Sequence, residues 1–363
     1  MAVIRVKLKE NSYDIMIGGG ILPQLGKALT PLKIGKDAVI ITDTSVGKLY
    51  AGRIVSSLNK AGYSAKVFAV APGEKSKSFK TVFHLIEDIA RYDVMKKIFI
   101  VALGGGVIGD LAGYIAACYK RGIPYVQVPT TFLAQIDSAI GGKTGVDLSV
   151  GKNLVGAFYQ PRLVYSDVKV LSSLDARQIR NGLAEAVKYG VIGDKQLFEY
   201  IAKHYDGFLS LDLSAILKVV SRCSRIKADV VMQDEKETKG LRTILNFGHT
   251  LGHAIENVFQ YDAYTHGEAV AIGMSAAAAL AHSLGLLSTH DHDRIDKLLH
   301  TLGFTLRLKP CNVHDLIQAM SMDKKVKEGW VQFVFPTHIG HFIIKNDTPL
   351  SQIEWALQRQ LSL

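Results

Sequence analysis

Two periodicities, one in each half of the chain, restrict the fold more than any other feature. In the first half, short apolar runs bounded by Gly, Asp, Pro or Lys predict strands. Amphipathic stretches between them, such as residues 46–61 and 80–92, predict helices. The predicted strands are residues 3–8, 13–17, 38–42, 65–70, 98–103 and 125–128. Alternating strands and helices are typical of a parallel sheet with helices on both faces.

The second half has long stretches with the 3.6-residue period of amphipathic helices. The predicted helices are residues 176–189, 196–204, 211–232, 243–259, 267–284, 290–302 and 351–361. A short β-hairpin at residues 331–335 and 341–345 interrupts them near the end. We therefore expect an α/β domain over residues 1–167, followed by a mostly α-helical domain over residues 168–363.

The formal net charge of +10 is compatible with nucleic acid, a membrane surface or a small anionic ligand. Because the lysines and arginines are dispersed and no RNA-binding signature is present, we expect a small anion. No apolar run reaches the length of about 18 residues that a membrane span needs. Cys118, Cys223 and Cys311 form no CxxC pair. Their scatter argues against a disulfide framework or a cysteine-bound zinc and favours a reducing cytoplasm.

Residues 100–110 combine a predicted buried strand, a glycine turn and the start of a helix. The spacing Gly104-x-Gly106-x-x-Gly109 matches the dinucleotide-binding fingerprint, in which the backbone approaches a pyrophosphate at a helix N-terminus. We expect Asp110 in the first turn of this helix, where the helix dipole favours a carboxylate. A tight strand-to-helix turn without a ligand is the alternative. The pattern predicts that the α/β domain binds a nucleotide.

Histidines and carboxylates of the second half form a candidate metal site. His249 and His253 are four residues apart and share one face of a predicted helix, as do Glu185 and Lys188 at a spacing of three. Two histidines with a carboxylate are typical of a zinc site with an open position, and spacing alone selects His249 and His253 as the ligand pair. The alternative is that the histidines only pack or cap. So many ionisable groups on otherwise apolar helices favour a functional role.

Lysines among glycines indicate an anion-binding region. Gly141-Gly142-Lys143-Thr144 resembles part of a phosphate-binding P-loop, but the full glycine spacing and a preceding strand are missing. We therefore do not expect nucleoside triphosphate hydrolysis. Each lysine alone is most simply a surface residue, whereas together they favour a phosphorylated ligand.

Seven segments, in order along the chain, together resemble the 3-dehydroquinate synthase family of sugar-phosphate cyclases. They are Gly-Gly-Gly-Val-Ile-Gly-Asp at 104–110, Pro-Thr-Thr-Phe-Leu-Ala-Gln-Ile-Asp-Ser at 129–138, Gly-Gly-Lys-Thr-Gly-Val at 141–146, Gly-Lys-Asn-Leu-Val-Gly-Ala-Phe at 151–158, Gly-Leu-Ala-Glu-Ala-Val-Lys-Tyr-Gly at 182–190, Leu-Asn-Phe-Gly-His-Thr-Leu-Gly-His-Ala at 245–254 and His-Gly-Glu-Ala-Val at 266–270. The resemblance implies that family's fold and activity. That activity converts 3-deoxy-D-arabino-heptulosonate 7-phosphate into 3-dehydroquinate and phosphate, the second step of the shikimate pathway.

The resemblance also implies NAD and a divalent metal, Zn²⁺ or Co²⁺. The implied metal ligands are Glu185, His249 and His266, which leaves His253 for proton transfer. The implied NAD-binding residues are Asp43, Glu74 and Lys77 on the adenosine side, and Gly104, Gly105, Gly106, Val107, Asp110, Thr130, Thr131, Lys143 and Lys152 toward the pyrophosphate and nicotinamide. The implied substrate-binding and catalytic residues are Asp137, Lys143, Lys152, Asn153, Lys188, Lys227, Arg242, Asn246, His253 and Lys324. Arg121 matches a position that reaches the phosphate site of a neighbouring subunit, so a homodimer is implied.

The implied chemistry accounts for both cofactors. Oxidation of the C5 hydroxyl by NAD makes the C6 proton acidic, so that phosphate can leave. The hydride then returns, the ring opens and an aldol reaction closes the carbocycle, with NAD regenerated. The main alternative is a metal-dependent polyol or alcohol dehydrogenase of the related fold. A sister cyclase acting on another sugar phosphate and a catalytically silent binding protein are two further alternatives.

Overall fold

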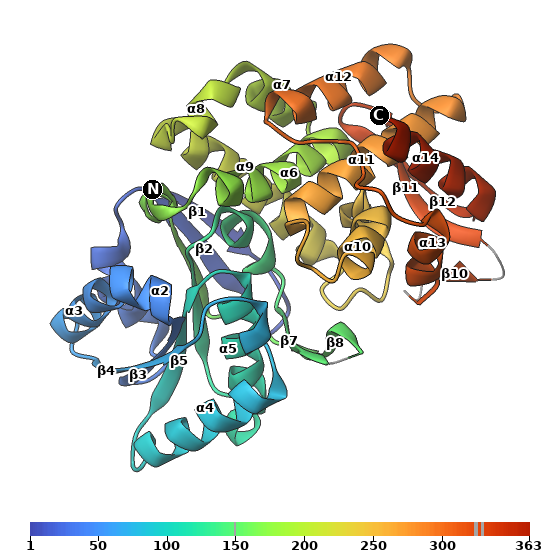
Figure 1. Ribbon diagram of the computed structural model, residues 1–363. Coiled ribbons are helices and arrows are strands. Elements are labelled where there is room, and N and C mark those ends of the chain that lie inside the picture. Colours follow the sequence, from blue (N-terminus) through green and yellow to red (C-terminus); the bar gives the residue numbers. More distant parts are fainter. Residues whose placement is uncertain (149, 323–325, 328–329) are drawn as a thin grey trace. The chain divides into compact units, whose positions relative to one another are not determined.

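The computed structural model describes residues 1–148, 150–322, 326–327 and 330–363. The chain divides into two compact units (Figure 1). Unit 1 comprises Met1–Leu174 and Ile216–Lys236, and unit 2 comprises Asp175–Ala215 and Glu237–Leu363. In the part of the chain that the model describes, no helix is long and apolar enough to cross a membrane.

This division differs from the expected boundary after residue 167, because unit 1 includes most of helix α9 (Leu213–Gln233). The Ser224 hydroxyl donates to the carbonyl of Gln135 at 3.2 Å, and the Lys227 ammonium donates to the carbonyl of Asp137 at 2.7 Å. These bonds attach a helix from the second half of the sequence to the α/β unit.

Unit 1 is built on a seven-stranded sheet that is parallel except at one edge. Its order is β1 (Ala2–Val6), β2 (Tyr13–Gly18), β9 (Leu163–Asp167), β6 (Tyr125–Pro129), β5 (Ile98–Gly104), β3 (Asp37–Asp43) and β4 (Ser64–Val70). The strand β9 was not predicted. β1 pairs antiparallel with β2, unlike the other neighbours. A short turn can join only an antiparallel pair, since parallel strands need a long crossover.

The helices of unit 1 cover the sheet as the alternating pattern predicted. Besides α9, they are α1 (Leu25–Leu29), α2 (Thr44–Val46) and α3 (Gly52–Lys60), with a π-helical turn at Gly47–Ala51 between α2 and α3, then α4 (Phe79–Tyr92) and α5 (Gly106–Cys118). Val39 and Ile100 belong to a core cluster with Leu85 of α4 and Leu111 of α5. All residues of β5 are buried, so helices or loops must cover both faces of that strand.

The strand order creates a reversal point between β3 and β5. From β3 the chain continues to the neighbouring β4 at the edge, whereas from β5 it continues to β6 on the opposite side. In open α/β sheets, ligands bind at the carboxyl ends of strands at such a point. Asp43 ends β3 and Gly104 ends β5, so residues expected to bind NAD lie at this point.

A two-stranded hairpin, β7 (Lys143–Leu148) and β8 (Gly151–Phe158), was also not predicted. It packs against α5, where a Cβ added at Gly113 would lie 2.5 Å from a methyl carbon of Thr144. The backbone N–H of Asp147 donates to the carbonyl of Lys77 at 2.8 Å. These contacts hold the hairpin, which carries Lys143 and Lys152, against the rest of unit 1.

Unit 2 is mostly helical and ends with a small antiparallel sheet. Its helices are α6 (Ala176–Gly193), α7 (Lys195–Lys203), α8 (Tyr205–Leu209), α10 (His249–Val258), α11 (His266–Ser283), α12 (Thr289–Thr301), α13 (Val313–Met322) and α14 (Leu350–Ser362). The strands are β10 (Val326–Lys327), β11 (Trp330–His338) and β12 (His341–Pro349). The fold class predicted from sequence is therefore confirmed.

The helix predicted over residues 243–259 is wrong in its first part. Leu241–Asn246 forms a 3-10 helix, and α10 begins only at His249. Gly248 between them has φ of +77°, a left-handed conformation that cannot continue a helix and that favours glycine. The helix α13 was not predicted.

The backbone of α11 touches the backbone at the start of α10, because both have glycine at the contact. A Cβ added at Gly273 of α11 would lie 2.0 Å from the carbonyl oxygen of Gly248, and one at Gly248 would lie 2.5 Å from the side chain of Met274. No side chain larger than hydrogen fits at these contacts. The packing brings His249, the first residue of α10, close to His266, the first residue of α11.

We expect Gly273→Ala to destabilise the protein by about 1–3 kcal/mol or more, because the added methyl group must push α10 away from α11. Gly52→Ala is the matched control, since a Cβ at Gly52 meets no atom within 4 Å and this residue is helical. That variant should be more stable than the parent by about 0.5–1 kcal/mol. Chemical denaturation measures both. Equal stability of the two variants would contradict the packing argument.

Candidate functional site

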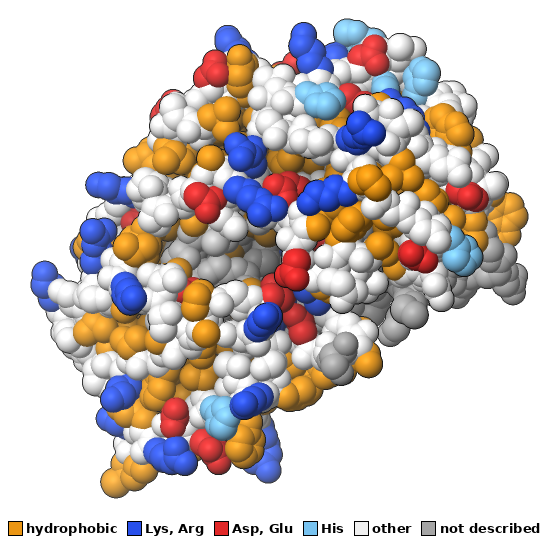
Figure 2. All heavy atoms as spheres, viewed as in Figure 1, with side chains coloured by type: hydrophobic (Ala, Val, Ile, Leu, Met, Phe, Trp, Pro, Cys, Tyr) orange, Lys and Arg blue, Asp and Glu red, His pale blue; other side chains and the backbone are white. Residues whose placement is uncertain are grey.

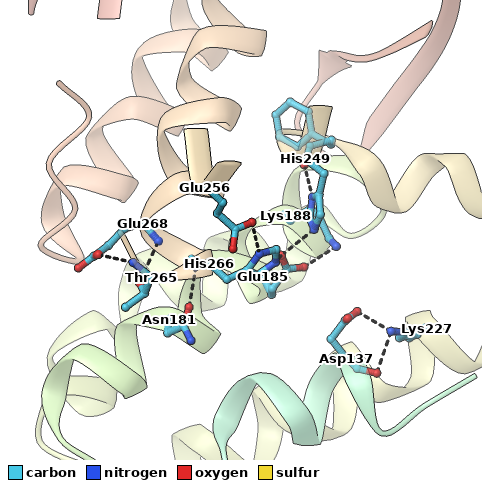
Figure 3. Close-up of polar contacts among 12 residues, drawn as sticks. Asp137, Asn181, Glu185, Lys188, Lys227, His249, Glu256, Thr265, His266 and Glu268 are labelled. Carbon is cyan, nitrogen blue, oxygen red and sulfur yellow. Dashed lines mark hydrogen bonds and ion pairs between the residues drawn. The ribbon is translucent and has the colours of Figure 1, made fainter. Parts of the chain in front are cut away.

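The strongest candidate site in unit 2 is formed by three side chains that begin or lie within three helices. Glu185 lies in α6 with 0% of its surface exposed, and His249 and His266 are the first residues of α10 and α11. The Nε2 atoms of His249 and His266 lie 3.1 and 3.4 Å from the same Glu185 oxygen, Oε1 (Figure 3). One ligand atom from each residue falls within 4.8 Å of the others, which is compatible with a shared metal ion.

Local capping fixes the start of α11 beside α6. The Asn181 side chain, one turn before Glu185, accepts from the N–H of Gly267 at 2.6 Å. Thr265 and Glu268 form a capping box at the same helix end. A Cβ at Gly267 would lie 2.4 Å from the carbonyl oxygen of Asn181, so glycine is required for this approach. The position of His266 is therefore set by the start of its helix.

Both histidine rings are oriented through their second nitrogen. Nδ1 of His249 lies 3.1 Å from the carbonyl oxygen of Phe247, and Nδ1 of His266 lies 3.1 Å from Oε2 of Glu256. An acceptor at Nδ1 holds a proton there, so that Nε2 is the nitrogen that faces Glu185 and that can bind a metal once it carries no proton. Metal-binding histidines in proteins almost always have such a partner.

The electrostatics of the trio are dominated by burial of the Glu185 carboxylate. Burial alone would raise its pKa, but Lys188 and His249 hold the pKa of Glu185 well below its ordinary value. Burial lowers the pKa of His249 to about 4. Burial would also lower the pKa of His266, yet the carboxylates of Glu185 and Glu256 outweigh it and raise that pKa to about 10. Lys188 is itself buried and forms an ion pair with Glu185.

A second set of potential ligands overlaps the first. His253, Glu256 and His266 also offer ligand atoms within 4.8 Å of one another. The rings of His249 and His253 are 5.4 Å apart, but neither set found among the described residues contains both. The pair selected by spacing, His249 and His253, is therefore divided between the two sets. His253 is also exposed.

Two further residues expected to bind the substrate, Arg242 and Asn246, lie on the 3-10 helix that precedes α10. Arg242 is buried, and its Nε lies 3.3 Å from Oε1 of Glu237. Asn246 ends the 3-10 helix and is half-buried. Lys324 lies outside the described residues.

In unit 1, the expected cofactor residues gather at the reversal point of the sheet. Asp43 caps α2, and its Oδ1 accepts from the N–H groups of Ser45 and Val46 at 2.8 and 2.9 Å. Gly104 accepts a hydrogen bond from the N–H of Thr130 at 2.9 Å. A Cβ at Gly105 would lie 2.9 Å from the Thr131 side chain, so packing alone requires part of the glycine turn.

The expected position of Asp110 in the first helical turn is wrong, because α5 begins at Gly106 and its first turn contains no acidic residue. Asp110 is instead held by an ion pair, with its Oδ2 atom 2.6 Å from Nζ of Lys77. Burial would lower the pKa of Lys77, but the Asp110 carboxylate outweighs it and raises that pKa. Lys77 also donates to the Asn153 side chain.

Of the other expected basic residues, some form ion pairs and some are exposed. Nζ of Lys152 lies 3.6 Å from Oε1 of Glu74, and Lys227 is buried with its Nζ 2.7 Å from Oδ1 of Asp137 (Figure 3). Lys143 is exposed at the start of β7. Arg121 is exposed in a left-handed conformation, with φ of +66°. Figure 2 shows other Lys and Arg side chains scattered over the surface rather than massed.

Two residues of these networks were missed by the sequence analysis. Glu256 lies seven residues after His249, which places both on one face of α10, and this spacing was an available signal. The Asp147 side chain accepts from the N–H of Asn153 at 2.8 Å, within the hairpin. The backbone N–H of Asp147 donates to the carbonyl of Lys77, which connects the hairpin to the segment that carries Lys77. No pattern in the sequence marks Asp147.

We expect Zn²⁺ binding to the metal-free protein near neutral pH to release about one proton, because a metal must displace the proton from His266. Because the pKa of His266 is about 10, that ring is protonated at neutral pH. The apparent affinity for Zn²⁺ should therefore rise as the pH increases toward the pKa of His266. Calorimetry in buffers with different ionisation enthalpies measures the release. Binding without proton release would contradict a charged His266 in the metal-free site.

Comparison with known proteins identifies the family of the chain. Two adjoining family models match the chain, 3-dehydroquinate synthase N-terminal over residues 67–181 and 3-dehydroquinate synthase C-terminal over residues 182–326. The 3-dehydroquinate synthase of Desulforamulus reducens is 44% identical over 354 residues, which cover 97% of this chain and 98% of the relative.

Solved structures of related cyclases share the whole fold. A 2-deoxy-scyllo-inosose synthase complexed with carbaglucose-6-phosphate, NAD⁺ and Co²⁺ is 27% identical, with a TM-score of 0.90 over 99% of this chain and 100% of that chain. The 2-epi-5-epi-valiolone synthase of Streptomyces hygroscopicus, with NAD⁺ and Zn²⁺ bound, is 29% identical, with a TM-score of 0.88 over 98% of each chain. The chain belongs to the 3-dehydroquinate synthase family.

Proposed function

We propose that this protein converts 3-deoxy-D-arabino-heptulosonate 7-phosphate into 3-dehydroquinate and phosphate, as a carbon–oxygen lyase. The observation that carries the proposal is the trio of the buried Glu185 and His249 with the half-buried His266, with the Lys188 cation against Glu185. Such a site suits an anionic sugar phosphate, and the family relationship selects this substrate among them.

The residues present fit a divalent metal. Both Glu185 oxygens are buried and accept no hydrogen bond of good geometry, although the two Nε2 atoms face one of them. Each ring is oriented through Nδ1, as expected for a ligand. Glu185, His249 and His266 would hold Zn²⁺ or Co²⁺, which when bound polarises substrate hydroxyl groups and lowers their pKa.

Unit 1 offers the residues to bind NAD, whose role when bound is to accept a hydride and return it. Asp43 keeps one carboxylate oxygen, Oδ2, outside its capping bonds, so it can accept from a ribose hydroxyl. The N-terminus of α5 at Gly106 favours the pyrophosphate. The Thr130 hydroxyl is buried and has no hydrogen-bond partner among the described residues, so it can contact the cofactor. Glu74, Lys77 and Lys152 would complete this site.

Several cations and amides are candidates to bind the anionic groups of the substrate. Arg242 offers a planar fork that matches a carboxylate, and Asn246 adds an amide on the same 3-10 helix. Lys143, Lys152 and Asn153 share one hairpin, in which the two lysines can neutralise phosphate and the asparagine amide can donate to it. Asp137, Lys227 and Lys324 are assigned to the substrate as well.

Proton transfer is assigned to His253. This residue is exposed and lies one helical turn after His249, with its ring 5.4 Å from that of His249. The exposed imidazole of His253 can reach a proton of the substrate, whereas His249 and His266 are committed to the trio.

The alternative dehydrogenase activity is disfavoured by charge. A small neutral alcohol needs neither the buried Arg242 nor the buried Lys188. The sister cyclases compared above are 27% and 29% identical, well below the 44% of the 3-dehydroquinate synthase relative. A silent binding protein would have no reason to keep an oriented metal trio.

We further propose a homodimer in the cytoplasm. Arg121 is exposed in a left-handed conformation, which costs free energy and is typical of residues held for a function, here toward a partner's phosphate site. Cys118, Cys223 and Cys311, all within the described residues, form no disulfide, which is typical of proteins from a reducing compartment.

We expect many molecules of phosphate to be released per NAD when the purified protein is given substrate and substoichiometric NAD. Chelation should stop the release, and Zn²⁺ or Co²⁺ should restore it in the parent but not in His249→Ala, because this variant lacks a ligand. Phosphate assay and NADH absorbance measure the two products. Accumulation of NADH with polyols, without phosphate, would favour the dehydrogenase instead.

We expect Arg242→Ala to raise KM for the substrate and to lower kcat/KM by about 10–100-fold, since a charged hydrogen-bond donor is lost. Its present partner, Glu237, is 37% exposed in its side chain and can be solvated, so the fold should survive. Arg242→Lys is the matched variant and should be intermediate, because it keeps the charge but not the fork. Unchanged KM and kcat in Arg242→Ala would remove this residue from the substrate site.

A further inference from the structure

Glu256 is a buried carboxylate to which the proposed chemistry assigns no role. It lies in α10, is 8% exposed, and directs Oε2 toward Nδ1 of His266 at 3.1 Å (Figure 3). Burying a carboxylate costs free energy unless it is paired, so its position beside His266 requires an explanation.

The contact determines which nitrogen of His266 carries the proton. A neutral imidazole has one N–H and one lone pair, and the hydrogen bond at one nitrogen decides which nitrogen remains free. With Glu256 accepting at Nδ1, Nε2 is the nitrogen that faces Glu185 and that has the lone pair when the ring is neutral. The negative charge of the acceptor also makes the free nitrogen a stronger ligand.

The two histidines of the trio differ in this respect. His249 has a neutral acceptor, the carbonyl oxygen of Phe247, whereas His266 has a charged one. The backbone fixes the first acceptor, but the second depends on a side chain of a different helix. His266 is therefore the ligand whose orientation a single substitution can release.

We infer that Glu256 is a positioning residue of the metal site, which binds His266 through Nδ1–H and thereby presents Nε2 to the ion. The inference rests on the proposed metal site and not on the proposed reaction. Its rival is that Glu256 itself binds a metal together with His253 and His266, since these three also lie within ligand distance of one another.

The test is Co²⁺ binding to the full-length, metal-stripped protein in competition with a chelator, without NAD or substrate. Glu256→Ala removes the acceptor and should weaken Co²⁺ binding by about 10–100-fold. Glu256→Gln keeps an oxygen that accepts from Nδ1–H but loses the charge, so its loss should be smaller. The visible absorption bands of bound Co²⁺ should keep their wavelengths in Glu256→Gln, because the ligand set is unchanged.

Glu268→Gln is the matched control for loosening of α11. Glu268 belongs to the capping box of that helix and pairs with Arg177 at 2.7 Å, but it does not face Nδ1 of His266 in any described contact. Glutamine can keep the capping box but loses the ion pair with Arg177, so this variant should lower the melting temperature of the metal-free protein with little effect on Co²⁺ affinity. A loss as large as that of Glu256→Ala would reduce the role of Glu256 to general stability and overturn the inference.

Two other results would also overturn it. One is Co²⁺ affinity of Glu256→Ala within about threefold of the parent, well short of the loss expected for an outer partner of a ligand. The other is a shift of the Co²⁺ bands in Glu256→Gln, which would identify Glu256 as a ligand. If Glu256→Ala does not fold, Glu256→Gln decides: weaker binding with unchanged bands supports the inference, and unchanged affinity contradicts it. Because no turnover is measured, an inactive enzyme cannot mimic either result.

Discussion

The arrangement of unit 2 depends on one buried negative charge. Glu185 is fully buried, and an unpaired carboxylate in that position would be strongly destabilising. Lys188 from its own helix and His266 from α11 supply positive charge, while the glycine contact between α10 and α11 allows the histidines to come close enough. Packing and charge are therefore coupled, since the close approach of α10 and α11 brings the histidines beside the buried carboxylate.

Periodicity was sufficient to predict the central sheet and most helices because their burial is regular. β5 is buried along its whole length and appears in the sequence as a continuous apolar run. The hairpin of β7 and β8 was missed because glycines and lysines interrupt its pattern. The false extension of α10 has a different cause, since a period of apolar residues carries no information on the positive φ of Gly248.

The candidate site was less accessible to the same reasoning. Spacing within one helix identified His249 and His253, but Glu185 and His266 come from other helices, and only the family resemblance joined them to His249. The dipole argument for Asp110 was wrong because the helix starts at Gly106, and Lys77, which pairs with Asp110, comes from a distant loop. Contacts made between separate segments are not encoded in any local pattern.

The inclusion of Ile216–Lys236 in unit 1 has a consequence for synthesis of the chain on the ribosome. When Leu174 has left the exit tunnel, the α/β unit still lacks α9, and with it the bonds from Ser224 and Lys227 to the Gln135–Asp137 turn. This unit therefore cannot be completed during translation of the first half alone. Its final form requires a segment that is synthesised after the first part of unit 2, so unit 1 can be completed only once Lys236 has left the tunnel.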